Sequence, residues 1–501
     1  MDWFDSLSGG LQGVLAWRPL LAILCGIVFG IMVGAIPGLS PSMGVALLVP
    51  FTYGMDPTVA LILLVAIYIG ASYGGSITAI TINAPGTASA VVTAIDGYPL
   101  TRQGRPATAL GVSLVVSTTA GMFGTLILIF FSVPLAAVAV RFHPAEYFAM
   151  AMFGLATIAS LAGANWHKAF LAALLGLFLN TVGTDPISGA ERFTFGFAPL
   201  SDGFPLIPAL IGLFALSEVF SAVNQRDFES TRLNGLRDPW PRWRDYWALR
   251  WVTLRSSIVG TVIGVFPGAG ATIAAFLSYD LERKFRKDKS GFGHGDVRGV
   301  AAAEGANSSS VGGAMVPLLT LGIPGSATTA VLVGAMMIHR LTPGPQLFLN
   351  RPDLIYGIFA AMLLANLALL IFGLAGSRLW IRVTAIPKRV LFTLVAAMAV
   401  VGAFAVRNSM FDVYCCIGFG ILGWFLKRHH YPLAPIILGM VLGSIAETNF
   451  RRAIMMDGGG VFLTRPITLT LLILAALSFI IPLLWRPKAT TSTSGDGSPR
   501  P

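Results

Sequence analysis

Long stretches without a charged side chain are the feature that most limits what this chain can fold into. Residues 19–55, 57–95, 106–140, 354–377 and 467–485 contain no Asp, Glu, Lys or Arg. A helix needs about 20 such residues to cross a bilayer, and inside lipid only helices and closed barrels satisfy their own backbone. The runs are continuously apolar rather than alternating, which argues against a barrel. The sequence therefore predicts an all-α polytopic membrane protein.

Composition and motifs exclude several classes of protein. Only 11% of the 501 residues are charged, whereas soluble domains carry about 25%. The net charge of +11 comes from basic residues between the apolar runs, which is typical of cytoplasmic loops and gives no reason to expect nucleic acid. The cysteines and histidines show no metal-ligand spacing, and no phosphate-binding loop or nucleophile elbow occurs. We therefore expect no enzyme, no cofactor and no structural metal.

Three short motifs recur in the same order in the two halves of the chain. GIMVGAIPGLS at 30–40 matches GTVIGVFPGAG at 260–270, NAPGTASA at 83–90 matches GIPGSATTA at 322–330, and PLIPALIG at 205–212 matches PLAPIILG at 432–439. Internal repeats are common in transporters. We predict two homologous halves, expected to be inverted, with discontinuous helices, re-entrant hairpins and about 10–14 membrane segments.

These repeats set the expected domain boundaries. We expect an N-terminal segment at 1–17, a first membrane repeat at 18–225, a cytoplasmic or interfacial linker at 226–249, a second repeat at 250–455, a final transmembrane helix at 456–486 and a disordered tail at 487–501. The linker is rich in arginine and tryptophan, which suits a cytoplasmic segment lying at the membrane interface. The tail is composed of small and polar residues, a composition that favours disorder.

Each half carries two Pro-Gly pairs within its apolar runs. They are Pro37-Gly38 and Pro85-Gly86, then Pro267-Gly268 and Pro324-Gly325. Proline breaks a helix, and glycine permits a tight turn. Irregular backbone at membrane depth is tolerated where protein buries it or where it lines a wet cavity. For a single pair, a kink explains the sequence as well as a site does, but paired breaks in two repeats with polar neighbours favour a substrate site.

Four acidic residues have competing interpretations. Glu304 precedes an uncharged stretch, so we expect it to be solvated at a membrane edge, with binding of a cation or proton as the alternative. Glu218 and Glu447 recur at the same place in both halves, which favours a structural cap or an ion pair, with the arginines at 451–452 available to Glu447. Asp96 in DGYP is expected to be a turn residue.

Several of these stretches resemble the large membrane subunit of the bacterial tripartite tricarboxylate transporters. They include GAIPGLSPSMGVALLVPFTYGMDP from residue 34, ITINAPGTASAVVTAIDGYPLTRQGRPATAL from residue 80, GVFPGAGATIAAFLSYDLE from residue 264, AAAEGANSSSVGGAMVPLLTLGIPGSATTAVL from residue 301 and PLAPIILGMVLGSIAETNFRRAI from residue 432. The resemblance runs from about residue 25 to residue 466. One departure is that Asn307 is followed by Ser308, where the family often has a second asparagine.

The resemblance implies a secondary carrier of the bacterial inner membrane that imports carboxylates with an ion gradient and without ATP. It also implies two partners, a periplasmic solute-binding protein and a small membrane subunit, and an organic carboxylate as substrate. The alternative that we keep open is a stand-alone ion-coupled carrier without a binding protein. A membrane-embedded enzyme or a channel is a more distant alternative, since the sequence offers few convergent titratable groups.

We predict that both halves place their Pro-Gly breaks around a central cavity. Backbone N–H groups and hydroxyls would hold the carboxylate, and backbone carbonyls with nearby amides would hold Na⁺, with H⁺ as the alternative ion. The predicted substrate-binding residues are Pro37, Gly38, Ser40, Pro41, Ser42, Ser76, Pro85, Gly86, Thr87, Ala88, Ser89, Gly268, Pro324, Gly325, Ser326, Ala327 and Thr328. The predicted Na⁺ site consists of Asn83, Asn307, Ser308 and Gly322.

Overall fold

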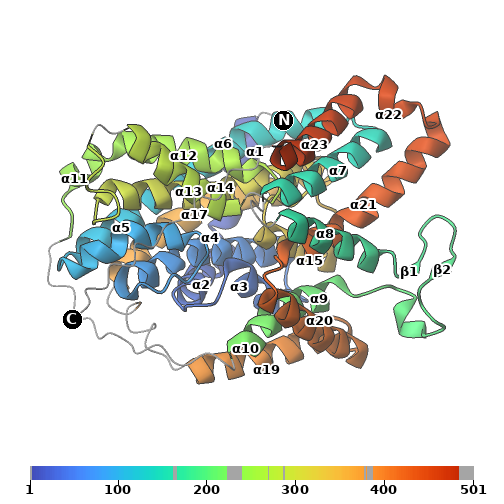
Figure 1. Cartoon of the computed structure of the whole chain (residues 1–501), viewed down its shortest axis with the longest axis horizontal. Coiled ribbons are helices and arrows are strands. Elements are labelled where there is room, and N and C mark those ends of the chain that lie inside the picture. The colour runs from blue at the N-terminus through green and yellow to red at the C-terminus, as the bar shows by residue number, and fades with distance from the viewer. Residues whose placement is uncertain are drawn as a thin grey trace, which may run out of the picture.

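The computed structural model describes residues 3–161, 166–222, 240–268, 270–285, 288–376, 380 and 388–484. Helices make up 79% of the structure, which confirms the predicted all-α membrane fold. Within the described residues, six helices are long and apolar enough to cross a membrane: α2, α4, α6, α17, α20 and the part of α19 from Val390 to Arg407. The chain is therefore a multi-pass membrane protein (Figure 1).

The first half contains ten α-helices in its described part. They are α1 (Trp3–Val14), α2 (Trp17–Gly34), α3 (Pro41–Leu48), α4 (Pro57–Ile82), α5 (Ala90–Arg102), α6 (Pro106–Ala139), α7 (Pro144–Leu161), α8 (Trp166–Asn180), α9 (Leu206–Ile211) and α10 (Ser217–Ala222). A π-helical turn, η4 (Gly212–Leu216), joins the last two, and shorter elements are η1 (Pro50–Thr52), β1 (Gly183–Thr184), β2 (Glu191–Arg192) and η3 (Ala198–Leu200).

The second half repeats the start of this order. Its helices are α11 (Trp243–Ala248), α12 (Arg250–Val265), α13 (Gly270–Phe285), α14 (Val297–Leu321), α15 (Ala327–Ile338), α16 (Pro345–Asn350), α17 (Pro352–Ala375), α19 (Lys388–Arg407), α20 (Met410–Arg428), α21 (Ala434–Asp457), α22 (Val461–Thr464) and α23 (Pro466–Leu484). The Pro-Gly pairs separate α2 from α3 and α4 from α5, then α12 from α13 and α14 from α15. All four pairs interrupt helices, as the motifs predict.

Glycines bring α2 into close contact with α4. A Cβ on Gly30 would lie 2.6 Å from the carbonyl oxygen of Ile67, and one on Gly34 would lie 2.2 Å from that of Ala71. Only small residues permit backbones to approach this closely. The contact of Gly34 with Ala71 lies four residues after that of Gly30 with Ile67 on both helices, so α2 and α4 run in the same direction. The segment that contains α3 must therefore lead the chain back to the start of α4.

Glycines also bring α12 into close contact with α14 in the second half. A Cβ on Gly260 would lie 2.3 Å from the carbonyl oxygen of Ala306, and one on Gly264 would lie 2.5 Å from that of Ser310. Helices α12 and α14 are therefore also parallel and closely packed. The GxxxG part of the repeated motif builds this packing, and the Pro-Gly part that follows ends the helix.

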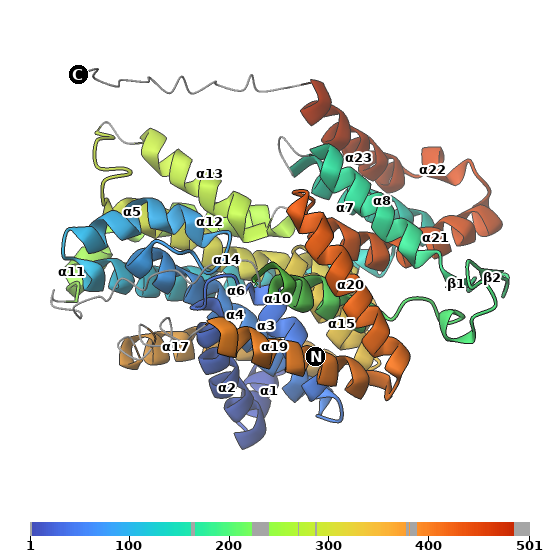
Figure 2. The ribbon, with the colours of Figure 1, turned by 60° about the horizontal axis from the view of Figure 1, so that its bottom comes forward.

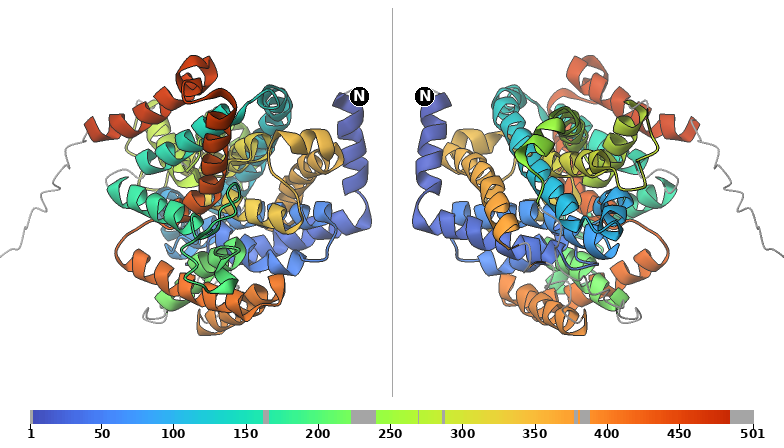
Figure 3. Two further views of the ribbon diagram at one scale, coloured as in Figure 1. Left: turned by 90° about the vertical axis from the view of Figure 1, so that its right-hand side faces the viewer. Right: turned by 90° about the vertical axis from the view of Figure 1, so that its left-hand side faces the viewer.

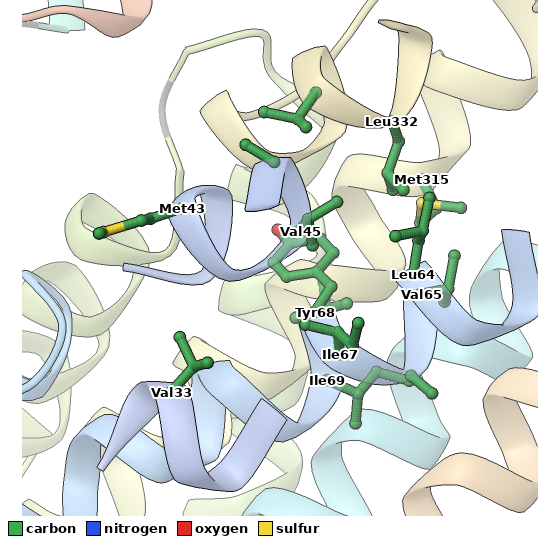
Figure 4. Close-up of a cluster of buried hydrophobic side chains, with 14 of the residues drawn as sticks. Val33, Met43, Val45, Leu64, Val65, Ile67, Tyr68, Ile69, Met315 and Leu332 are labelled. Carbon is green, nitrogen blue, oxygen red and sulfur yellow. The ribbon is translucent and has the colours of Figure 1, made fainter. Parts of the chain in front are cut away.

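The two halves meet where α4 crosses α14. The amide nitrogen of Asn307 donates to the carbonyl of Ser72 at 3.0 Å, and Ser76 faces the carboxylate of Glu304. Residue numbers rise on α4 as they fall on α14, so these helices are antiparallel. Helix α2 runs parallel to α4, and α12 runs parallel to α14. The corresponding helices of the two halves therefore run in opposite directions, and the repeats are inverted, as expected. Figure 4 shows apolar side chains of α2, α3 and α4 packed near Met315 and Leu332 of the second half.

The remaining long helices form two groups outside this core. Helices α7, α8, α21 and α23 pack on one another, and α19 and α20 pack with α9, η4 and α10. Figure 2 shows the first group on the right, and Figure 1 shows α19 and α20 along the bottom of the view. Helix α1 lies at the edge beside α17 (Figure 3), where Gly10 packs on the backbone of Tyr356. The last helix ends beside α7 rather than within the core.

One prediction about local structure is wrong. Asp96 is not in a turn but within α5, and it is fully buried. Its carboxylate accepts hydrogen bonds from Tyr279 and from the backbone N–H groups of Gly293, Gly295 and Asp296. The backbone at Asp96 is therefore determined by the contact of its carboxylate with the segment at 293–296 and not by the local DGYP pattern.

Some predicted segments lie wholly or partly outside the described residues. These are the linker up to residue 239 and the tail at 487–501. The described part of the linker includes α11, where Trp243 and Trp247 are exposed. The region expected to hold the final helix contains α22 and α23, and α21 extends two residues past the expected end of the second repeat. The domain boundaries themselves remain predictions.

Candidate functional site

The long helices end at matching positions in the two halves, each in the left-handed conformation. Asn83 closes α4 with φ 53°, and Gly322 closes α14 with φ 74°. Asparagine and glycine are the residues that adopt this conformation most readily at a helix end. A structural role as a helix cap therefore accounts for both residue types, although both lie in the predicted Na⁺ site.

The two interruptions of each half lie against each other. A Cβ on Gly86 would stand 2.0 Å from the carbonyl oxygen of Gly34, and one on Gly325 would stand 2.9 Å from that of Gly264. The backbone N–H of Gly268 donates to the carbonyl of Gly325 at 3.1 Å. Glycine is needed where one backbone approaches another this closely. The four breaks thus form two pairs of breaks: the first pair contains Pro37-Gly38 and Pro85-Gly86, and the second pair contains Pro267-Gly268 and Pro324-Gly325.

Hydroxyl groups cap the short helices that start after the breaks. Ser40 accepts a hydrogen bond from the backbone N–H of Met43 at the start of α3, and Thr87 accepts one from Ala90 at the start of α5. At the start of α15, Ser326 accepts from the backbone N–H of Thr329 at 3.2 Å, and Thr329 accepts from that of Ser326 at 2.7 Å. Such caps use some of the free donors of each helix.

The two pairs of breaks lie on either side of the α4–α14 crossing. On α4, the first pair contacts Gly75, three residues beyond Ser72 at the crossing. On α14, the second pair contacts Ala314, seven residues beyond Asn307. Because the helices are antiparallel and rise about 1.5 Å per residue, the pairs are displaced in opposite directions, by about 15 Å in all.

A buried polar cluster lies beside the first pair. Its centre is the carboxylate of Glu304, which is 0% exposed. Thr93 and Ser117 donate to its two oxygens, the second at 3.1 Å, and Ser76 and Asn307 also face it. The expectation of a solvated Glu304 at a membrane edge is therefore wrong, because α4, α5 and α6 pack around this part of α14.

A large cavity lies beside the second pair. It has a volume of about 780 Å³ and is lined by residues from α8, α9, α15, α16 and α21 and by the segment 340–343. Gly322 lies on its wall. Its charged wall residues are Arg340 and Asp202, and Asp202 lies 3.9 Å from Arg407. Arg340 is exposed, so its guanidinium is available to an anion in the cavity.

The predicted site residues are thus divided between these places. Gly322 lines the cavity, Ser76 and Asn307 belong to the Glu304 cluster, Ser308 follows Asn307 on α14, and the other predicted residues lie at or beside the two pairs of breaks. The side chains of Ser42, Thr87, Ser89, Ser308, Ser326 and Thr328 are buried. The hydroxyl of Tyr68 lies 3.2 Å from that of Ser326 and joins the halves. Sequence reasoning missed Tyr68, Thr93, Ser117 and Arg340, since nothing local marks their tertiary partners.

The acids that recur late in each half form ion pairs, which confirms the structural interpretation. Glu218 pairs with Lys427, and Glu447 pairs with Arg192 at 2.7 Å and with Arg451 at 3.1 Å. Glu218 ties α10 to α20, and Glu447 ties β2 to α21. Glu218 also lies against the first break, because a Cβ on Gly38 would stand 3.3 Å from its carboxylate oxygen.

Arg451 also binds Asp185 at 2.6 Å, in the loop after α8. The backbone N–H of Ile187 is the main reason that the pKa of Asp185 lies below its ordinary value, and the N–H of Ser188 and the guanidinium of Arg451 lower the pKa further. Each of these donors favours the ionised carboxylate. Asp185 therefore holds the loop at the edge of the cavity against α21.

Comparison with known proteins identifies the family. Residues 20–438 match the model of the tripartite tricarboxylate transporter TctA family. An Agrobacterium vitis protein described as "Uncharacterized 52.8 kDa protein in TAR-I ttuC' 3'region" is 38% identical over 486 residues, which cover 97% of each chain. A shorter A. vitis protein, "Uncharacterized protein in TAR-II ttuC' 3'region", is 41% identical over 227 residues, covering 45% of this chain and 94% of the relative. No solved structure matches. The chain therefore belongs to the tripartite tricarboxylate transporter TctA family.

Proposed function

We propose that this protein imports a di- or tricarboxylate across the bacterial inner membrane by alternating access, driven by a cation gradient. A periplasmic solute-binding protein would deliver the substrate, and a small membrane subunit would complete the transporter. The observation that carries the proposal is the inverted arrangement of two pairs of Pro-Gly breaks around the α4–α14 crossing. Broken helices at corresponding places in inverted repeats are the usual position of a carrier's substrate site.

The chemistry of the broken segments suits an organic anion and a small cation. Hydroxyls at 40–42 and 87–89 beside the first pair of breaks and at 326 and 328 beside the second, with free N–H groups at the helix starts, would bind carboxylate oxygens. Backbone carbonyls at the left-handed residues Asn83 and Gly322, at opposite ends of the crossing, and the side chains of Asn307 and Ser308 near its centre would offer separate places for Na⁺. A bound cation would offset the repulsion between the substrate and these carbonyls, which couples the two fluxes.

The cavity beside the second pair suits a vestibule through which the carboxylate arrives. Its volume falls in the range of small-molecule sites, about 300–1,000 Å³, and Arg340 supplies a positive charge on its wall. A guanidinium is well matched to a carboxylate because it can donate two parallel hydrogen bonds. Gly322 connects this cavity to the broken end of α14.

The proposal is tested by uptake into sealed vesicles. The chain is reconstituted with its small subunit and binding protein, and uptake of radiolabelled succinate and citrate is measured with and without an inward Na⁺ gradient. We expect gradient-dependent accumulation that requires the binding protein. Equal uptake by the chain alone would favour the stand-alone carrier, and a conductance in planar bilayers would favour a channel; either result contradicts the proposal.

Single substitutions then test the predicted site. Asn83, Thr87, Asn307 and Ser326 are replaced one at a time by alanine, and the affinity for substrate and the Na⁺ dependence are compared with those of the unmodified protein. We expect at least Thr87→Ala and Ser326→Ala to weaken the apparent substrate affinity. Unchanged affinity and ion dependence in all four variants would remove these side chains from the mechanism.

A further inference from the structure

Glu304 is surrounded by neutral oxygen-bearing side chains from three other helices. Thr93 of α5 and Ser117 of α6 donate to its carboxylate, and Ser76 of α4 and Asn307 of α14 itself face it. These side chains are buried: Glu304, Ser76, Thr93 and Ser117 are 0% exposed, and Asn307 is 1% exposed. The cluster therefore has no direct contact with solvent.

The cluster lacks a balancing charge. Within the described residues, no Lys, Arg or His nitrogen lies within 4.0 Å of the Glu304 carboxylate, whereas three other buried acids have one: Glu146 pairs with Arg465, Glu282 with Arg255 and Asp412 with Arg407. Asp96 is also buried without an ion pair, but three backbone N–H groups and the hydroxyl of Tyr279 donate to its carboxylate. A buried ionised carboxylate is costly unless another charge compensates it. Hydrogen bonds from neutral hydroxyls reduce this cost but do not neutralise the charge of the carboxylate.

Two oxygens beside the carboxylate also lack hydrogen bonds. Ser76 Oγ and Asn307 Oδ1 have no partner among the described residues. The amide nitrogen of Asn307 donates to the carbonyl of Ser72 at 3.0 Å, which directs the amide oxygen away from that bond. Buried polar atoms are rarely left unpaired in proteins. Both oxygens and the carboxylate are hard donors of the type that bind alkali and alkaline-earth cations.

We propose that this cluster is a Na⁺ site, with Glu304 supplying the negative charge and Asn307 and Ser76 supplying neutral oxygens. A proton on Glu304 would remove the charge and add a donor, and with the Ser76 hydroxyl donating to Asn307 Oδ1 it is the competing explanation that acidification tests. A sodium ion neutralises the carboxylate and accepts lone pairs from both oxygens at once. The hydroxyls of Thr93 and Ser117 hold the carboxylate in place.

The position of the cluster explains how such an ion would influence transport, a consequence that rests on the proposed function. Ser76 adjoins Gly75, which contacts Thr87 in the first pair of breaks. The ligands come from α4 of the first half and α14 of the second, so an ion would link the halves at their crossing. Binding of Na⁺ would therefore hold α4 and α14 together beside the first pair of breaks before the carboxylate arrives.

The test measures Na⁺ binding directly, without substrate or partners. The purified full chain in detergent is titrated with NaCl at constant ionic strength, with choline chloride as the replacement salt, and thermal unfolding and ²²Na⁺ binding are followed. We expect saturable stabilisation by Na⁺ that KCl does not reproduce. Glu304→Gln, which keeps the size of the side chain and removes its charge, is expected to weaken Na⁺ binding at least tenfold.

Matched variants separate this result from a general loss of folding. Glu146→Gln removes another buried carboxylate charge, one that pairs with Arg465 outside the cluster, and is expected to keep the Na⁺ affinity. If Glu304→Gln does not fold, Ser76→Ala removes one unpaired oxygen without changing charge and is expected to weaken Na⁺ binding severalfold.

Two outcomes would overturn the proposal. One is the absence of Na⁺-specific binding by the unmodified protein, including the case in which acidification alone produces the stabilisation, which would assign a proton to Glu304. The other is unchanged Na⁺ affinity in both Glu304→Gln and Ser76→Ala. Uptake in vesicles separates the two failures: carboxylate uptake that persists with the binding protein while Na⁺ binding fails would reject this site alone, whereas no uptake by the complete transporter would reject the proposed function.

Discussion

Gly86 lies directly over the carbonyl oxygen of Gly34, so that a Cβ on Gly86 would be 2.0 Å from this oxygen and 2.9 Å from the Cα of Gly75. Three segments of the first half therefore meet at one point: the end of α2, the middle of α4 and the break before α5. The break is held by backbone packing rather than left loose.

The first prediction follows from this contact. Gly86→Ala must move backbone atoms and is expected to destabilise the protein by about 1–3 kcal/mol and to reduce uptake. Gly418→Ala is the control, because no atom lies within 4 Å of a Cβ there, and it should raise stability by up to about 1 kcal/mol through helix propensity. Thermal unfolding in detergent compares them. Equal stability of the two variants would show that the first pair of breaks is not closely packed.

The second prediction separates the backbone of Asn83 from its side chain. Asn83→Gly keeps the left-handed conformation and the carbonyl proposed to bind Na⁺, so stability and Na⁺-dependent uptake should be retained. Asn83→Ala should cost about 1–2 kcal/mol, and a β-branched valine should cost more. Loss of Na⁺ dependence in a stable Asn83→Gly variant would instead assign the amide side chain as a ligand.

The third prediction concerns the response to acid. Because the pKa of Asp185 is lowered in the folded protein from its ordinary value of 3.8, its ionised form stabilises the fold above that value. This contribution falls as the pH drops below about 5. Asp185→Asn should lower the unfolding temperature near neutral pH and reduce its decline between about pH 5 and pH 3.

The control for this measurement is Asp280→Asn, since Asp280 is an exposed acid that pairs with Lys284 four residues later on α13. It should leave the decline with pH almost unchanged, because exposed pairs contribute little to stability. An Asp185→Asn variant with the same acid response as the unmodified protein would show that the ion pair with Arg451 does not hold the loop.

The fourth prediction tests the cavity. Arg340→Gln should raise the apparent KM for the transported carboxylate by about tenfold or more, since a hydrogen bond to a charged group is worth about 1.5–3 kcal/mol. Arg340→Lys keeps the charge and should raise the apparent KM by a smaller factor. Arg452→Gln removes an exposed arginine of α21 that does not line the cavity. Identical KM values for Arg340→Gln and Arg452→Gln would exclude the cavity as the vestibule.

Family membership makes the protein a membrane component of a tripartite tricarboxylate transporter, which is a transporter rather than an enzyme. The motifs that predicted this resemblance are the same motifs that build the repeats. Gly30 and Gly34 pack α2 on α4, and the Pro-Gly pair at 37–38 ends α2. Family signature and fold therefore share one physical basis.

The sequence by itself determined the membrane class, the two repeats and the places where helices break. Each of these depends on properties that act locally: uncharged runs partition into lipid, proline removes a backbone donor, and glycine permits close approach. The late acids Glu218 and Glu447 were predictable as ion pairs because they recur at equivalent positions in both halves.

Only the tertiary structure decided which polar groups share a site. Asp96 and Glu304 each stand alone in the sequence, yet Asp96 holds the segment at 293–296, and Glu304 meets hydroxyls that lie 187 and 211 residues away. Such partners meet because antiparallel repeats cross at Ser72 and Asn307. The free energy of a buried carboxylate depends on those distant neighbours, and local sequence does not encode them.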